Sequence, residues 1–174
     1  WLAVAPDESL VIYRELYCSK VTATDLADMI LDAEKEDGTI RYGVLDSSLW
    51  HNRGDTGPSL AEQMNMKGCR WRPSDRSKGS RVSGKNELHR RLQVDEFTEK
   101  PRIVFMSTCT HTIAQLPAIP LDKRNPEDVD TNSEDHLYDA LRYGIMTRPR
   151  SSIWDFNPAT QRSGFQAADP SFGY

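Results

Sequence analysis

Hydrophobic and polar positions at the start of the chain predict a β-hairpin followed by a helix. The apolar run Trp1–Ala5 and the β-branched, aromatic run Leu10–Leu16 are separated by the turn-forming residues Pro-Asp-Glu-Ser. Apolar residues then recur at helical spacing through positions 25–37, with Thr24 as the expected N-cap and Gly38 after the last turn. We therefore expect a hairpin and then an amphipathic helix.

Strands and helices alternate through the rest of the chain as far as position 147. The hydrophobic pattern predicts strands at Ile40–Asp46, Cys69–Arg72 and Ile103–Ser107, and helices at Ser59–Met66, Lys85–Val94, Thr110–Leu116 and Asp135–Met146. The inward residues expected for the Lys85–Val94 helix are Leu88 and Leu92. Polar loops are expected at 47–57, 76–84 and 121–132. This alternation is typical of an α/β fold with helices on both faces of a mixed β-sheet.

The composition changes after position 147. Residues 148–174 are rich in Pro, Ser, Gly and Gln, which predicts an extended or disordered tail outside a domain spanning 1–147. No run approaches the roughly 18 apolar residues of a membrane span, so we expect no membrane partner. Cys18, Cys69 and Cys109 are widely spaced, and reduced thiols are expected.

Charge is unevenly distributed along the chain. The formal net charge is −4, but between Lys67 and Arg91 nine basic residues face only two acidic ones, a local charge of +7. This window predicts contacts with DNA phosphates by Arg76, Lys78, Arg81, Lys85, Arg90 and Arg91. A solvated charged face is the plain alternative.

Asp46 is the first candidate for chemistry. It closes an apolar strand, and the ends of strands are where α/β folds usually present catalytic groups. The alternative is an ordinary aspartate that caps the following loop through Ser47 or Ser48.

The late acidic helix carries the second group of candidates. Asp135 and Asp139 are four residues apart and so share one helix face, with His136 on the flank. Carboxylate oxygens are the ligands that Mg²⁺ or Mn²⁺ selects, and His136 suits Mn²⁺ somewhat better. Alternatively, Glu134 and Asp135 stabilise the helix macrodipole and Arg142 neutralises Asp139.

Read together, five segments resemble the C-terminal nuclease domain of tailed-phage terminase large subunits. They are YGVLDSSLW around Asp46, GPSLAEQM at 57–64, SKGSRVSGKNELHRRL at 77–92, IVFMSTCTHTIAQLP at 103–117 and DKRNPEDVDTNSEDHLYDALRYGIM at 122–146. The last segment is the most specific of the five. The resemblance implies an RNase H-like fold, with a central mixed β-sheet flanked by helices on both faces.

The resemblance also implies an activity and a set of ligands. Such domains are endonucleases that cut concatemeric double-stranded DNA, using two Mg²⁺ or Mn²⁺ ions that clamp the scissile phosphate. Asp46 and Asp139 match the catalytic metal ligands, His136 matches an additional ligand, and Asp135 is a neighbour that ligates or orients. The implied partners are DNA, the packaging ATPase domain of the same protein, the portal and the small terminase subunit, in the host cytoplasm.

One departure and two alternatives accompany the resemblance. The family's first acidic ligand lies on the first strand, whereas no Asp or Glu precedes Pro6 here and Asp7 lies at the wrong end of the hairpin. We expect that ligand upstream, so this piece alone should need high Mn²⁺ or Mg²⁺. The alternatives are a non-catalytic module that grips DNA and docks on the portal, and another RNase H-like nuclease such as a resolvase or a transposase.

Overall fold

A computed structural model describes residues 1–52, 57–96, 98–130 and 133–147. The expected tail at 148–174 lies outside these residues. The predicted hairpin is confirmed, because β1 (Leu2–Val4) and β2 (Leu10–Ile12) pair antiparallel with Ala3 opposite Val11. β5 (Ile103–Phe105) pairs parallel with the other side of β2. These strands form a three-stranded mixed sheet in the order β1-β2-β5.

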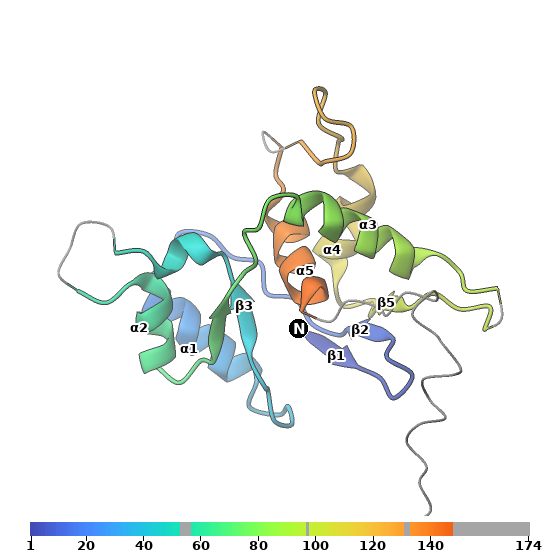
Figure 1. The fold of residues 1–174 in the computed structure, drawn as a ribbon. Helices are drawn as coiled ribbons and strands as arrows, with labels where there is room; N and C mark the ends of the chain where they lie inside the picture. Colours follow the sequence, from blue (N-terminus) through green and yellow to red (C-terminus); the bar gives the residue numbers. More distant parts are fainter. Residues whose placement is uncertain (53–56, 97, 131–132, 148–174) are drawn as a thin grey trace, which may run out of the picture.

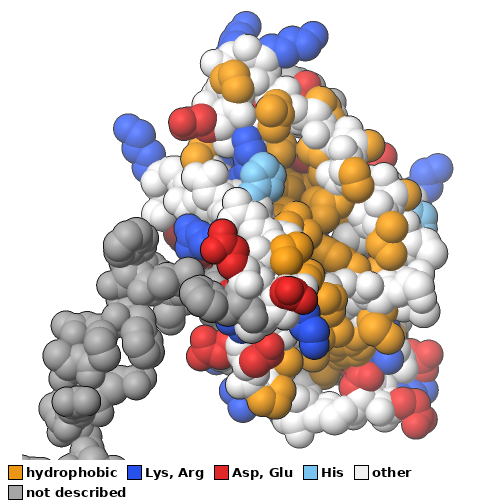
Figure 2. Space-filling view, turned by 90° about the vertical axis from the view of Figure 1, so that its right-hand side faces the viewer, with side chains coloured by type: hydrophobic (Ala, Val, Ile, Leu, Met, Phe, Trp, Pro, Cys, Tyr) orange, Lys and Arg blue, Asp and Glu red, His pale blue; other side chains and the backbone are white. Residues whose placement is uncertain are grey.

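One face of this sheet carries the larger of two hydrophobic cores. Two helices pack on it, α3 (Ser80–Leu92) and α5 (His136–Met146) (Figure 1). The core contains Leu10, Ile12, Leu88, Ile103, Cys109, Val129, Tyr138, Leu141 and Ile145. Because side chains alternate along a strand, Val104 points to the other face, and it is 43% exposed. Figure 2 shows a band of hydrophobic side chains on the side that carries the hairpin in Figure 1.

A second, smaller core surrounds a separate pair of strands. β3 (Gly43–Leu45) and β4 (Trp71–Pro73) pair in parallel and belong to no larger sheet among the described residues. They pack with α1 (Ala23–Ala33) and α2 (Leu60–Met66) around Ala27, Ile30, Met64 and Cys69. The mixed α/β class is therefore confirmed. The expectation of one central sheet is not met in these residues, and the RNase H-like fold stays a prediction.

The helix boundaries follow local capping chemistry. Helix α1 begins two residues earlier than predicted, because Thr22 rather than Thr24 caps it, accepting from the backbone N–H of Asp25 over 3.1 Å. Helix α2 follows Ser59, which forms a capping box with Glu62. Helix α4 (Thr110–Gln115) is confirmed and continues into η2 (Leu116–Ala118).

The prediction of a loop at 76–84 is wrong over its second half. Helix α3 starts at Ser80, directly after Gly79, whose φ of 87° is a conformation that glycine adopts at little cost. Gly84 lies inside the helix because a larger residue does not fit: a Cβ there would lie 2.3 Å from Cγ of Arg142 on α5. Leu88 is buried as predicted, whereas Leu92 is 41% exposed and does not point inward.

Two further features position the candidate site. A 3₁₀ helix, η1 (Ser47–Trp50), occupies part of the predicted loop at 47–57. Val129 is 5% exposed within the larger core and anchors the acidic loop that precedes α5.

Within the described residues, no helix is long and apolar enough to cross a membrane. All three cysteines are free.

Candidate functional site

Asp46 lies directly after β3, at the edge where the two parallel strands β3 and β4 both end. Its Oδ1 accepts a hydrogen bond from the backbone N–H of Ser48 over 2.7 Å, so Asp46 caps η1. Its Oδ2 accepts from the hydroxyl of Tyr143 over 2.7 Å. The capping role that the sequence left open is therefore observed, and the second oxygen connects the strand end to α5.

These contacts keep Asp46 ionised. Its partial burial opposes the charge, but the hydrogen bonds from Ser48 and Tyr143 outweigh burial and lower the pKa of Asp46 to about 2. Burial and the hydrogen bond to Asp46 raise the pKa of Tyr143 to about 12, so the phenol stays a donor. At neutral pH the site therefore presents a carboxylate whose orientation is fixed from both sides.

Asp139 lies one helical turn before Tyr143 on α5. Residues four apart share a helix face, so the face that reaches Asp46 also carries Asp139. The charges of both carboxylates contribute to raising the pKa of Tyr143. The phenol of Tyr143 thus contacts Asp46 and lies on the helix face that carries Asp139, two predicted ligands that are distant in sequence. Their role as ligands stays a prediction.

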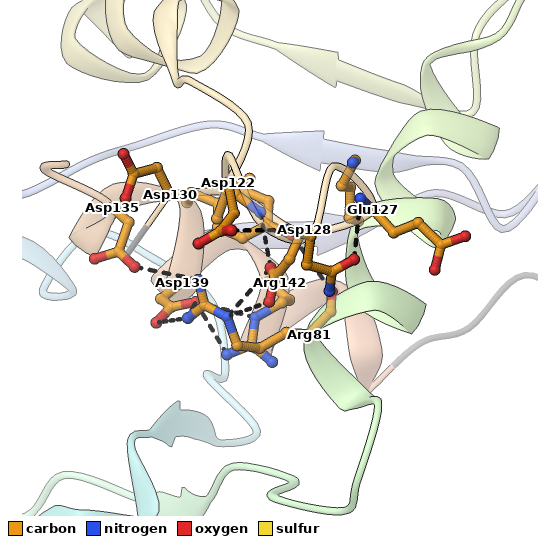
Figure 3. A network of polar contacts seen from close by, with 12 residues as sticks. Arg81, Asp122, Glu127, Asp128, Asp130, Asp135, Asp139 and Arg142 are labelled. Atoms are coloured by element: carbon orange, nitrogen blue, oxygen red, sulfur yellow. Dashed lines mark hydrogen bonds and ion pairs between the residues drawn. The ribbon is translucent and has the colours of Figure 1, made fainter. Parts of the chain in front are cut away.

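Arg81 lies among three aspartates (Figure 3). Its Nη1 lies 3.2 Å from both carboxylate oxygens of Asp139, and its Nη2 lies 3.3 Å from Oδ2 of Asp135. Its Nε lies 3.2 and 3.3 Å from the oxygens of Asp128. Burial opposes the charge of Arg81, but Asp139 and Asp128 outweigh it and raise the pKa of the guanidinium. The three carboxylates therefore converge on one cation.

A second arginine also contacts Asp139. Arg142 is 4% exposed, and its Nε and Nη2 lie 3.1 and 3.0 Å from Oδ1 of Asp139. Its guanidinium carbon lies 4.5 Å from the centre of the Tyr143 ring. The neutralising role considered for Arg142 is therefore observed. The close approach of α3 at Gly84 holds this arginine in place.

The remaining predicted ligands lie at the start of α5. Asp135 is the N-cap residue of the helix, and its carboxylate is 13% exposed beside Arg81. His136 is the first helical residue and is exposed. In the part of the chain that the structure describes, no group of three or more His, Cys, Asp or Glu side chains is arranged as a metal-binding cluster.

Two of the six predicted DNA-binding residues, Arg76 and Lys78, are exposed in the segment that follows β4. The charge of Arg76 contributes to lowering the pKa of Asp46. Arg90 is also accessible, with a side chain 47% exposed, and its Nη1 lies 2.9 Å from Glu87.

The other three basic residues do not form the single exposed surface that the sequence suggested. Lys85 is 8% exposed, and its Nζ donates to the carbonyl oxygen of Pro126 over 2.9 Å. Arg91 is 2% exposed and forms an ion pair with Glu87 at 2.8 Å. Arg81 is engaged by the aspartates. Helix α3 directs these cations toward the protein interior. The net charge of the sequence window therefore did not predict which cations are exposed.

Sequence reasoning missed two residues of this site. Tyr143 was not singled out, although its spacing of four from Asp139 was visible in the predicted helix. Asp128 was assigned only to an acidic loop. Its position depends on the burial of Val129 and on the antiparallel bridge between Leu121 and Val129, which local sequence does not reveal.

No protein-family model, curated protein or solved structure matches this chain. We therefore infer its function from the hydrogen bond between Tyr143 and Asp46, from Asp139 on the same helix face, and from the charges around them.

Proposed function

We propose that this chain is the metal-dependent endonuclease domain of a viral DNA-packaging terminase, which cuts concatemeric double-stranded DNA by two-metal-ion hydrolysis. One observation carries the proposal: the hydroxyl of Tyr143 joins Asp46 at a strand end to the helix face that carries Asp139. The resemblance of five sequence segments to terminase nuclease domains supports the same function. The ATPase domain, the portal and the small subunit as partners, and the host cytoplasm as location, belong to this proposal.

The carboxylates around Arg81 are the chemical type that binds a hard divalent cation, although among the described residues they are not arranged as a metal-binding cluster. Three carboxylates already surround the positive charge of Arg81, and carboxylate oxygens are the donors that Mg²⁺ and Mn²⁺ prefer. Asp46 and Asp139 would hold the ions. Asp135 and His136 lie near Asp139 at the start of α5 and would be additional ligands. When bound, the two ions supply charge for the transition state and activate water at neutral pH.

The chain's own groups prepare this site. Tyr143 fixes the orientation of Asp46 and keeps it ionised, so no proton has to leave before a cation binds. Arg76 and Lys78 are exposed in the segment that follows β4, which suits contacts to DNA phosphates that position the duplex.

The test is nicking of supercoiled plasmid DNA at high Mn²⁺ concentration. Asp46→Asn and Asp139→Asn are each expected to abolish nicking, because each removes an anionic ligand. Asp32→Asn is the matched control, since Asp32 is an aspartate on α1 whose side chain is 71% exposed, and it should cut as the unmodified chain does. Nicking that persists in both site variants would exclude the assignment.

A second candidate function is a DNA-gripping module without catalysis. The observation that favours it is the occupation of Asp139 by two arginines, Arg81 and Arg142. Binding and cleavage measured at several salt concentrations, with and without EDTA, distinguish the two functions. Salt-sensitive binding with no metal-dependent cutting would favour the gripping module, because phosphate contacts release counterions.

A further inference from the structure

The guanidinium of Arg81 and a divalent cation require the same carboxylate oxygens. Arg81 lies within 3.3 Å of Asp128, Asp135 and Asp139, and Figure 3 shows it between the acidic loop and α5. Both oxygens of Asp139 are engaged by Nη1 of Arg81. Each carboxylate oxygen has a second lone pair that an ion could use, but a divalent cation held by Asp139 would lie beside the positive guanidinium, so the two cations repel each other and compete for Asp139.

The position of Arg81 allows such a displacement without unfolding. Its backbone is held in the first turn of α3, and its carbonyl oxygen accepts from the hydroxyl of Tyr138 over 3.5 Å. Its side chain remains 27% exposed, so water can reach it. The first turn of a helix is unfavourable for a positive charge, so the aspartates are what hold the guanidinium there.

We propose that Arg81 is an internal counter-ion that competes with the divalent metal for Asp139. In the metal-free protein it holds Asp128, Asp135 and Asp139 together, and metal binding releases its guanidinium from Asp139. The freed charge then lies on the helix that follows the exposed basic residues Arg76 and Lys78, where a DNA phosphate can take the place of the carboxylate. This inference rests on the proposed metal site.

The first test is Mn²⁺ affinity, measured by the electron paramagnetic resonance signal of free Mn²⁺. Arg81→Met removes the competing charge at similar length, and its Mn²⁺ affinity is expected to be about fivefold tighter than that of the unmodified chain. Mn²⁺ should also raise the melting temperature of Arg81→Met by more than it raises that of the unmodified chain. Arg81→Lys keeps the charge and should restore most of the competition. Lys35→Met, which removes an exposed cation just after α1, is the control and should leave the affinity unchanged.

The second test follows Arg81 directly in the unmodified chain. The Nε–H nuclear magnetic resonance signal of Arg81, assigned by its absence in Arg81→Lys, is followed during a Mg²⁺ titration. It is expected to shift and to exchange faster with water as the guanidinium leaves the carboxylates. An unchanged signal at saturating Mg²⁺ would overturn the competition, as would equal or weaker Mn²⁺ affinity in Arg81→Met.

These outcomes separate the inference from the proposed function. If Mn²⁺ binding depends on Asp46 and Asp139 but not on Arg81, the counter-ion role fails while the metal site stands. If the unmodified chain binds no Mn²⁺, or binds it equally well after Asp139→Asn, the proposed metal site itself fails.

Discussion

The hydroxyl of Tyr143 donates to Oδ2 of Asp46 over 2.7 Å, across 97 positions of sequence. This bond connects the end of β3 to the face of α5 that carries Asp139, and so joins the two halves of the candidate site.

Removing that hydroxyl should raise the pKa of Asp46. In Tyr143→Phe we expect the pKa to move from about 2 toward the ordinary 3.8, and the free energy of unfolding at neutral pH to fall by about 1 kcal/mol. The depressed pKa adds stability that is complete above pH 3.8 and is lost as the pH falls to about 2, so the variant should lose part of this acid resistance. Carboxyl carbon chemical shifts followed against pH measure the pKa directly.

Tyr13 provides the matched control for this substitution. Its hydroxyl donates to Oδ2 of Asp37 over 2.9 Å, a similar pair remote in sequence from Asp46. Tyr13→Phe should leave the pKa of Asp46 unchanged. A pKa of Asp46 that stays near 2 in Tyr143→Phe would show that the phenol does not set it.

In an alkaline titration, three tyrosines should ionise well above the usual tyrosine pKa. Burial first, and then nearby carboxylates, raise the pKa of Tyr13, Tyr138 and Tyr143 to about 12. Because these phenols ionise more easily when unfolded, the stability they add is present below pH 10 and is lost as the pH rises toward 12. Ultraviolet absorbance of tyrosinate, with circular dichroism to confirm folding, should show the late step shrink by one phenol in Tyr143→Phe. An early titration of Tyr143, near pH 10, would contradict its burial against Asp46.

The ion pair between Arg91 and Glu87 should matter for stability rather than for DNA binding. Both side chains are buried, at 3% and 5% exposure, and removing one partner leaves an uncompensated charge. Arg91→Ala is expected to cost about 3 kcal/mol in denaturant unfolding. Arg90→Ala removes the exposed partner of the same Glu87 and should cost less than about 1 kcal/mol. Equal costs for the two variants would exclude a buried pair.

The exposed and buried cations should differ in their effect on DNA binding. Arg76→Gln is expected to reduce the salt dependence of the binding constant by about one counterion, because the exposed guanidinium lies beside the candidate site. Lys85→Met should leave that slope unchanged, since Lys85 donates to Pro126 within the protein. The measurement is a fluorescence anisotropy titration at several salt concentrations. If the salt dependence changed in Lys85→Met but not in Arg76→Gln, Lys85 rather than Arg76 would be the residue that contacts DNA.

Gly84 should not tolerate a methyl group. Gly84→Ala places a carbon against Arg142, and we expect a loss of about 1–3 kcal/mol with a weakened contact between Arg142 and Asp139. Gly38→Ala, where a Cβ meets nothing within 4 Å, is the control and should change stability by less than about 0.5 kcal/mol. The measurement is thermal unfolding of the two variants, and equal melting temperatures would contradict a steric clash at position 84.

Local patterns were enough to predict much of the fold. The hairpin, β5 and the helices α2, α4 and α5 follow from hydrophobic spacing and turn residues. The position of Asp46 after β3 follows in the same way. Helix α3 was placed too late because it begins at a glycine with no side-chain cap, so the usual signal for a helix start is missing.

The site's electrostatics were not predictable from local patterns. A basic window gives the number of cations, but the orientation of α3 decides that Lys85 and Arg91 are buried, whereas Arg76 precedes the helix and is exposed. The bond from Tyr143 to Asp46 and the three carboxylates around Arg81 depend on tertiary contacts between distant segments. Only the fold supplies that information.

The two hydrophobic cores make the candidate site responsive to movement. Asp46 follows a strand that packs in the smaller core, whereas Asp139 lies on a helix whose buried face belongs to the larger one. The distance between the two carboxylates therefore depends on how the two cores pack against each other. In the proposed metal site, a partner that altered this packing would therefore alter the affinity for a cation without touching either carboxylate.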